Sequence, residues 1–336
     1  MPSRPAIKPM PAITGLLEQF ATHPLVALGE MHGLQEEADF ITALLHHPAF
    51  PATVQVIVYE IGNARHQAVV DRFIAGEPIA ARDLRPVWRD IIGWGFDAPI
   101  YEQFFRTVRA INRTLPVAQR LRVLLGDPPI DWSQVQFTLE TEYIWQEKRD
   151  AHYTEVVETQ VLAPGHHGLL IAGTAHFVRD WPSEFPFPIH ENVVQRLERK
   201  HPGSVHVILP HIGFGPENST LEPYLADWPI PSLASLRTTW LGELSAALHL
   251  NNFSGPPPVA GWEPPPLKPG FTFGHMADSY LYLGPRSSLT KSTVNPAIYR
   301  GDEQYLSYLQ RRESTYPGIL KVDSLLTEGD PRYFAD

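Results

Sequence analysis

Five short, almost continuously apolar segments recur along the first two-thirds of the chain, separated by stretches with helical periodicity. Apolar runs of about four to eight residues are typical of strands buried on both faces of a parallel sheet. The segments are Leu25–Gly29, Val54–Tyr59, Leu121–Leu125, Leu169–Ala172 and Val205–Leu209. Their alternation with helices predicts an α/β fold, in which a mostly parallel central sheet carries helices on both faces.

Amphipathic helices are predicted between these strands from apolar residues spaced three and four apart. They span residues 12–22, 36–46, 64–75, 100–112, 134–161 and 191–200, while the aromatic stretch 77–99 is expected to be irregular and could cover the site.

Proline clusters at 256–258 and 264–266 change the character of the chain and predict an extended connector. We therefore expect an α/β domain over residues 12–250. A Pro-rich connector and a C-terminal extension follow over residues 251–336 and pack on the main domain. Within this extension, the sequence predicts a strand at 279–284 and a helix at 303–312.

The composition excludes several classes of function. The 336-residue chain has 27 Lys and Arg against 37 Asp and Glu, and its net charge of −10 argues against binding to nucleic acid or anionic membranes. Cysteine is absent, which excludes disulfides, thiolate nucleophiles and Cys-ligated metals. No segment has the roughly 18–20 apolar residues of a membrane span, and the N-terminus has no apolar stretch typical of a signal peptide. We expect a cytoplasmic protein whose partner is a small-molecule or peptide substrate.

Two of the predicted strands end in the same motif, Gly-x-x-His. The first is Gly29-Glu30-Met31-His32, and the second is Gly173-Thr174-Ala175-His176. Ligands bind outside the carboxyl ends of the strands in such sheets, so we expect His32 and His176 to share one polar site. An imidazole can transfer protons near neutral pH or ligate a metal. For each histidine, a hydrogen bond to its own loop is the alternative role.

Acidic residues stand at three of the predicted strand ends: Glu30, Glu60 and Asp127. A carboxylate there can orient a histidine, act as a base or hold a metal. We expect Glu30 and Glu60 in catalysis and Asp127 in substrate binding. A salt bridge to the following loop is the alternative for Glu60, and a turn within Gly-Asp-Pro-Pro is the alternative for Asp127.

Two arginines on predicted helices are candidates for the same site. A guanidinium aimed at the carboxyl edge could fix a carboxylate or stabilise a developing oxyanion. We expect Arg149 in catalysis and Arg109 in substrate binding, with a solvated helix surface as the alternative for each. The sequence has neither a Gly-x-Ser-x-Gly elbow nor a His-Glu-x-x-His motif, which excludes the common serine hydrolases and zincins.

These motifs resemble those of the superfamily that joins the ChaN-like haem-binding uptake proteins, the Tiki and TraB proteases and the erythromycin esterases. Residues 28–33 look most like the first motif of the ChaN type, and residues 171–176 are similar to the second. Glu60 matches the acidic position of the group. The segments that resemble those of the esterases are 109–112, 126–127 and 149–150. The first motif has one residue fewer between Glu and His than its counterpart in the esterases.

The resemblance and the strand-end chemistry together favour a hydrolase of an ester or amide bond. In a metal-free version, His32 activates water, Glu30 or Glu60 orients it, and His176 and Arg149 stabilise the oxyanion. In the version that the Tiki resemblance implies, His32, His176 and a carboxylate such as Glu30 hold a divalent ion of Mn, Zn, Fe or Co. The alternative that the ChaN resemblance implies is a protein that binds haem or another small ligand without hydrolysis.

Overall fold

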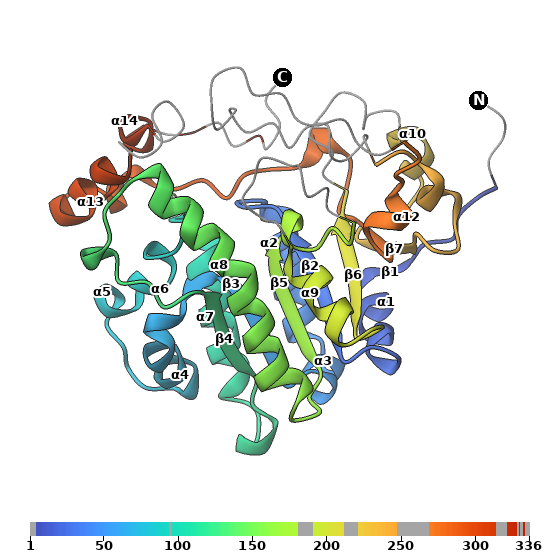
Figure 1. Cartoon of the computed structure of the whole chain (residues 1–336), viewed down its shortest axis with the longest axis horizontal. Coiled ribbons are helices and arrows are strands. Elements are labelled where there is room, and N and C mark those ends of the chain that lie inside the picture. Colours follow the sequence, from blue (N-terminus) through green and yellow to red (C-terminus); the bar gives the residue numbers. More distant parts are fainter. Residues whose placement is uncertain are drawn as a thin grey trace.

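The structure is a computed structural model that describes residues 5–93, 96–180, 191–211, 221–246, 269–313 and 321–327, with residues 329 and 332. Its centre is an eight-stranded sheet in the order β1-β7-β8-β6-β2-β5-β3-β4 (Figure 1). The strands are β1 Met10–Pro11, β2 Leu25–Glu30, β3 Val56–Asn63, β4 Arg122–Asp127, β5 Gly168–Gly173, β6 Val205–Pro210, β7 Ser232–Ser235 and β8 Ser279–Tyr282.

The sheet is mixed but mostly parallel, as predicted. Strands β8, β6, β2, β5, β3 and β4 run parallel to their neighbours in this order, whereas β7 is antiparallel to both β1 and β8. The five predicted apolar segments all appear as strands: four lie inside the sheet as β2, β3, β5 and β6, and the segment at 121–125 is the edge strand β4. The two strands that the sequence analysis missed, β1 and β7, are short and lie at or next to one edge of the sheet.

Helices flank the sheet (Figure 1). They are α1 Ala12–Glu18, α2 Gln35–His46, α3 Ala49–Thr53, α4 Gln67–Ala75, α5 Ala81–Leu84, α6 Pro86–Arg89, α7 Pro99–Asn112, α8 Leu139–Val157, α9 Val193–Lys200, α10 Glu222–Leu225, α12 Phe273–Met276, α13 Glu303–Glu313 and α14 Val322–Leu325. The predicted helices are all present with shifted ends, and the stretch expected to be irregular contains α5 and α6. No helix in the described part of the chain combines the length and apolar character that crossing a bilayer needs.

The continuous apolar character of β2 follows from burial of both sheet faces. Val26 and Leu28 belong to a core that includes residues of α2, α4 and α7. Leu25 and Ala27 point the other way, into a core with residues of α8 and α9. Successive side chains of a strand alternate between faces, so each residue of β2 needs an apolar side chain until the strand reaches the carboxyl edge.

The C-terminal region contributes to the same sheet. The strand predicted at 279–284 is β8, which pairs with β6 on one side and β7 on the other. The helix predicted at 303–312 is α13. The Pro-rich connector predicted before them falls largely outside the described residues, which resume at 269.

Candidate functional site

The polar side chains predicted for the strand ends gather at the carboxyl edge of β2, β5, β3 and β4. Glu30 ends β2, and its partner in the strand register is Gly173, which ends β5. Further along the edge, Asn63 of β3 pairs with Asp127, the last residue of β4. Parallel pairing therefore brings segments that are far apart in the sequence to one edge, as the position of ligand sites in such sheets requires.

The two Gly-x-x-His motifs deliver their histidines to different environments. The side chain of His32 is 44% exposed, whereas that of His176 is only 6% exposed. Nδ1 of His32 lies 2.6 Å from Oε2 of the buried Glu30. A Cβ atom placed on Gly173 would lie 3.5 Å from Nε2 of His32 and 3.4 Å from Oε2 of Glu60. Nδ1 of His32 is thus bound to the carboxylate of Glu30, and the carboxylate of Glu60 lies near the ring on the side of Gly173.

These neighbours control the charge of His32. Desolvation lowers the pKa of His32, but the charge and hydrogen bond of Glu30, together with the charge of Glu60, outweigh it and raise the pKa above 6.5. An ionised carboxylate can only accept hydrogen bonds, so Nδ1 carries the proton and Nε2 holds the lone pair of the neutral ring. His32 therefore has the chemistry of a general base.

Arg149 of α8 binds the two buried carboxylates of β3 and β4. Its Nη1 donates to Oε1 of Glu60 at 3.0 Å, and its Nε donates to Oδ1 of Asp127 at 2.8 Å. Its Nη2 donates to the carbonyl of Ile92 at 2.7 Å. The backbone N–H of Gly173 donates to Oε2 of Glu60 at 2.5 Å. Arg149 therefore uses its donors on protein oxygens and fixes the orientation of Glu60.

The two carboxylates that Arg149 binds differ in their acidity. Burial raises the pKa of Glu60, but the charges and hydrogen bonds of Arg149 and His176 outweigh burial and hold that pKa well below its usual range. Burial raises the pKa of Asp127 to about 7, although Arg149 and the backbone N–H of Ile92 oppose it. Glu60 is consequently a fixed negative charge at neutral pH.

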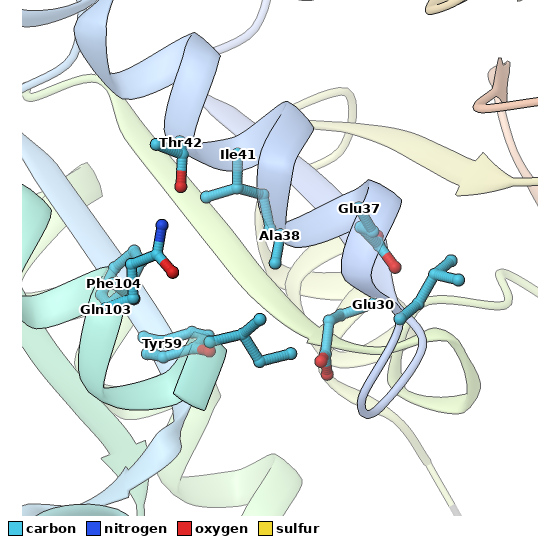
Figure 2. A pocket seen from close by; sticks show the side chains of 10 residues that line it. Glu30, Glu37, Ala38, Ile41, Thr42, Tyr59, Gln103 and Phe104 are labelled. Carbon is cyan, nitrogen blue, oxygen red and sulfur yellow. The ribbon is translucent and has the colours of Figure 1, made fainter. Parts of the chain in front are cut away.

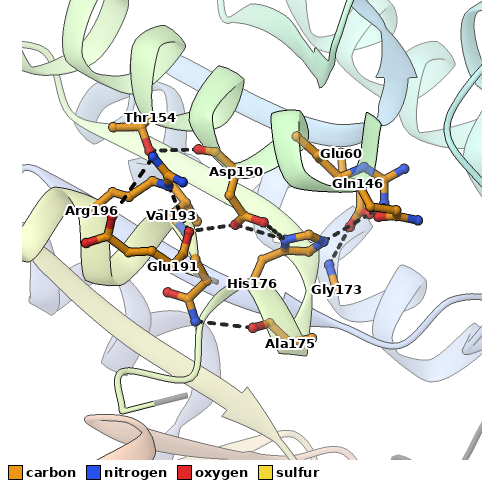
Figure 3. A network of polar contacts seen from close by, with 12 residues as sticks. Glu60, Gln146, Asp150, Thr154, Gly173, Ala175, His176, Glu191, Val193 and Arg196 are labelled. Atoms are coloured by element: carbon orange, nitrogen blue, oxygen red, sulfur yellow. Dashed lines mark hydrogen bonds and ion pairs between the residues drawn. The ribbon is translucent and has the colours of Figure 1, made fainter. Parts of the chain in front are cut away.

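His176 belongs to a buried network (Figure 3). Its Nδ1 lies 2.9 Å from Oδ2 of Asp150, and Oδ1 of Asp150 accepts the backbone N–H of Val193 at 2.8 Å. Nε2 of His176 lies 3.7 Å from Oε1 of Glu60. Burial lowers the pKa of His176, but Asp150 and Glu60 raise it to about 9. His176 is therefore a cation that joins Glu60 to the start of α9.

A small pocket opens beside Glu30 on the face covered by α2 and α7 (Figure 2). Its volume of about 20 Å³ is enough for one water molecule. Glu37 lines this pocket, and its Oε2 accepts the backbone N–H of Met31 at 2.8 Å. Burial, and the nearby charge of Glu30, raise the pKa of Glu37 well above its usual range. Burial thus favours the protonated form of Glu37 beside Glu30.

Arg109 does not join the other predicted residues. Its Nη1 donates to the carbonyl of Phe73 at 2.7 Å, and its Nη2 donates to the carbonyl of Gly76 at 2.7 Å. These carbonyls lie at the end of α4, where unpaired carbonyl groups accept such donors. The guanidinium stabilises a helix terminus in the structure, which leaves its predicted role in substrate binding without a contact that supports it.

Three side chains could hold a divalent ion. Glu30, His32 and Glu60 each offer one ligand atom, and these atoms all lie within 4.8 Å of one another. Two carboxylates and one imidazole form a donor set that Zn²⁺, Mn²⁺ or Fe²⁺ accepts. His176, which we expected in this set, instead has Nδ1 engaged by Asp150. Within the described residues, Glu60 takes its place.

Asp150, Glu37 and Phe96 also belong to this site, although sequence reasoning assigned them no role. Glu37 lies four residues before Ile41 on α2, so a charge on the apolar face of the helix was the available signal. Asp150 follows Arg149 and points to the other motif histidine. The ring of Phe96 lies 5.0 Å from that of His32, and no sequence pattern marks this contact.

Solved structures with the same architecture are known. The chain matches the erythromycin esterase EreC, solved as a mutant in its open conformation, with a TM-score of 0.50 and 11% identity over 80% of this chain and 91% of EreC. The chain has the fold of the erythromycin esterases. This finding confirms, for the fold, the resemblance read from the motifs.

Two further structures share this fold. One is a Bacillus cereus protein, with a TM-score of 0.54 and 11% identity over 83% of this chain and 94% of that protein. The other is described as a succinoglycan biosynthesis protein, with a TM-score of 0.56 and 10% identity over 82% of this chain and 94% of that protein. No protein-family profile and no curated protein sequence matches the chain.

Proposed function

We propose that the protein hydrolyses an ester or amide bond with His32 as general base. The observation that carries this proposal is the position of the His32 ring, 44% exposed, with Nδ1 bound to the buried Glu30 at 2.6 Å. A histidine that is oriented by a buried carboxylate and whose ring is partly exposed has the arrangement of a catalytic base. The esterase EreC among the structures of this fold supports the same class of reaction.

The reaction needs only water and the substrate. Nε2 of His32 takes a proton from a water molecule as the water oxygen bonds to the carbonyl carbon and the carbonyl electron pair moves onto its oxygen. The tetrahedral intermediate then expels the leaving oxygen or nitrogen, which takes the proton from His32. The products are a carboxylic acid and an alcohol or amine, and His32 returns to its neutral form.

The buried residues support this proton transfer. Glu30 holds the ring and stabilises the imidazolium that forms during the first step. Glu60 adds a second fixed negative charge, because Arg149, the Gly173 N–H and His176 hold its carboxylate in place. In this proposal Arg149 and His176 are positioning residues. They orient Glu60 and do not stabilise the oxyanion, which is the role that their residue types led us to expect.

A divalent ion fits the same proposal. Glu30, His32 and Glu60 would hold it, and a bound ion would lower the pKa of a water molecule and polarise the carbonyl group. Arg149 would remain the hydrogen-bond partner of Glu60 and hold its carboxylate in place. A metal-loaded site and a metal-free site thus depend on the same three side chains.

The test is a panel of nitrophenyl esters and peptide anilides assayed with the wild type, His32→Ala and His46→Ala. His46 is an exposed histidine of α2 and serves as the matched control. We expect His32→Ala to lose about 100-fold or more in turnover, with His46→Ala unchanged. Full activity in His32→Ala would overturn the proposal. Absence of hydrolysis together with a visible absorption band on titration with haem would favour the binding-protein alternative.

A further inference from the structure

The described residues of segment 89–97, which are 89–93 and 96–97, border His32 and include a buried carboxylate that binds the C-terminal region. The side chain of Asp97 is 1% exposed, and its Oδ1 accepts Nε of Arg89 at 2.7 Å. Its Oδ2 accepts the hydroxyl of Tyr299 at 3.1 Å and that of Tyr305 at 2.8 Å. Arg89 is close to Asp97 in the sequence, whereas Tyr299 and Tyr305 lie 202 and 208 residues after Asp97, in the C-terminal region.

Further contacts bind the same two regions. The guanidinium of Arg89 lies 3.8 Å above the ring of Tyr305, and its Nη1 donates to Oδ2 of Asp302 at 3.2 Å. Arg312 of α13 is completely buried and donates from Nη1 to the carbonyl of Ile91 at 2.9 Å. Figure 1 shows α13 on the same side of the molecule as α6, whose last residue is Arg89. The C-terminal region therefore contacts the described residues of segment 89–97 at several points.

The other side of this segment contacts the candidate site. The ring of Phe96 packs edge to face on that of His32, with 5.0 Å between centroids and 85° between planes. It also lies 5.5 Å from the ring of Tyr101. Ile92 donates its N–H to Asp127 at 2.8 Å and accepts Nη2 of Arg149 at 2.7 Å. Segment 89–97 thus lies between the catalytic edge and the C-terminal region.

We infer that Tyr299 and Tyr305 position Phe96 against His32, through Asp97, so that the C-terminal region sets one wall of the site. Phe96 directly precedes Asp97, so the carboxylate that fixes this wall of the site belongs to the neighbouring residue. Two hydroxyl donors and one guanidinium hold that carboxylate. An aromatic wall beside the base selects substrates with an aryl or branched apolar group next to the scissile bond, a consequence that rests on the proposed function.

The test of the positioning uses a readout that needs no substrate. Diethyl pyrocarbonate modifies histidine rings, and mass spectrometry gives the rate at each histidine. In the Tyr299→Phe/Tyr305→Phe double variant, we expect His32 to react at least three times faster than in the wild type, because Phe96 no longer shields its ring. The exposed His46 in the same molecule is the internal control, and Tyr224→Phe on α10 is the control for losing a tyrosine hydroxyl elsewhere.

A double-mutant comparison separates positioning from general loosening. Phe96→Leu alone should speed modification of His32, and adding the two tyrosine changes should then have no further effect. An unchanged His32 rate in a folded Tyr299→Phe/Tyr305→Phe variant would overturn the inference, as would equal increases at His32 and His46. If the tyrosine variant fails to fold, an unchanged His32 rate in Phe96→Leu overturns it. Absence of hydrolysis by the wild type would remove the proposed function and leave this modification result standing.

Discussion

Oε2 of Glu30 and Nδ1 of His32 lie 2.6 Å apart, two residues from each other at the end of β2. The strand carries Glu30 to the carboxyl edge as its last buried residue, and the turn that follows exposes His32. The same hydrogen bond fixes the ring and determines which nitrogen carries the proton. The first motif, Gly29-Glu30-Met31-His32, therefore supplies both a buried partner and an exposed histidine.

Gly173→Ala tests the space between His32 and Glu60. The backbone of Gly173 has φ −50° and ψ 138°, which alanine adopts without strain. Its new methyl group would lie 3.4 Å from Glu60 Oε2 and 3.5 Å from His32 Nε2, which is ordinary contact. We expect a folded protein with a melting temperature close to that of the wild type and a loss of roughly tenfold or more in turnover. Full turnover in this variant would show that the reacting water lies elsewhere.

Arg149→Met should destabilise the protein strongly. It removes the guanidinium that both Glu60 and Asp127 bind in the protein interior, and removing one partner of a buried ion pair costs roughly 3–5 kcal/mol. The control is Arg106→Met, whose pair with Glu102 on the exposed side of α7 should contribute at most about 1 kcal/mol. Denaturant unfolding measures both. Equal effects of the two substitutions would contradict the structural role of Arg149.

His176 should make stability depend on pH. Its pKa is about 9 in the folded protein and 6.5 when unperturbed, so its contribution is fully present below pH 6.5 and is lost as the pH rises through 9. The difference in unfolding free energy between the wild type and His176→Gln should therefore be larger at about pH 6 than at about pH 10. The same difference at both pH values would mean that His176 is neutral in the folded state.

Metal titration distinguishes the two proposed ligand sets. With Zn²⁺ or Mn²⁺ added to the apoprotein, isothermal calorimetry should show binding that His32→Ala and Glu60→Gln each weaken at least tenfold. His176→Gln should bind nearly as the wild type does, because His176 is not one of the three proposed ligands, and Arg149 and the Gly173 N–H still hold Glu60. Loss of binding in both His176→Gln and His32→Ala, with Glu60→Gln unaffected, would restore the set expected from the two motifs.

The sequence predicted most of the sheet and its functional edge, because burial on both faces makes the central strands almost continuously apolar. It also placed Glu30, His32, Asp127 and His176 at or just beyond strand ends, where the structure has them, whereas Glu60 lies inside β3, which continues to Asn63. It did not predict β7, whose Ser-Leu-Ala-Ser sequence has no distinctive strand pattern. The motifs also do not predict that His32 is exposed and His176 is buried, because this difference depends on the packing of α8 and α9 over His176.

Residues that act through distant contacts were the hardest to predict. Arg109 and Arg149 both lie on helices. Only the tertiary structure shows that Arg109 donates to carbonyl groups at the end of α4, whereas Arg149 binds Glu60. The contact between Phe96 and His32 depends on a loop held by Tyr299 and Tyr305. No local periodicity encodes such a contact, because its parts meet only after the chain has folded.

The pH dependence of kcat/KM in the wild type and in Glu30→Gln tests the central claim most directly, using the best ester or anilide from the panel. If His32 is the base and Glu30 raises its pKa, the wild-type rate should rise with pH around a midpoint above 6.5. Glu30→Gln removes the charge that raises this pKa, so its midpoint should lie at a lower pH and its maximal rate should fall. Identical midpoints in the two proteins would contradict the account.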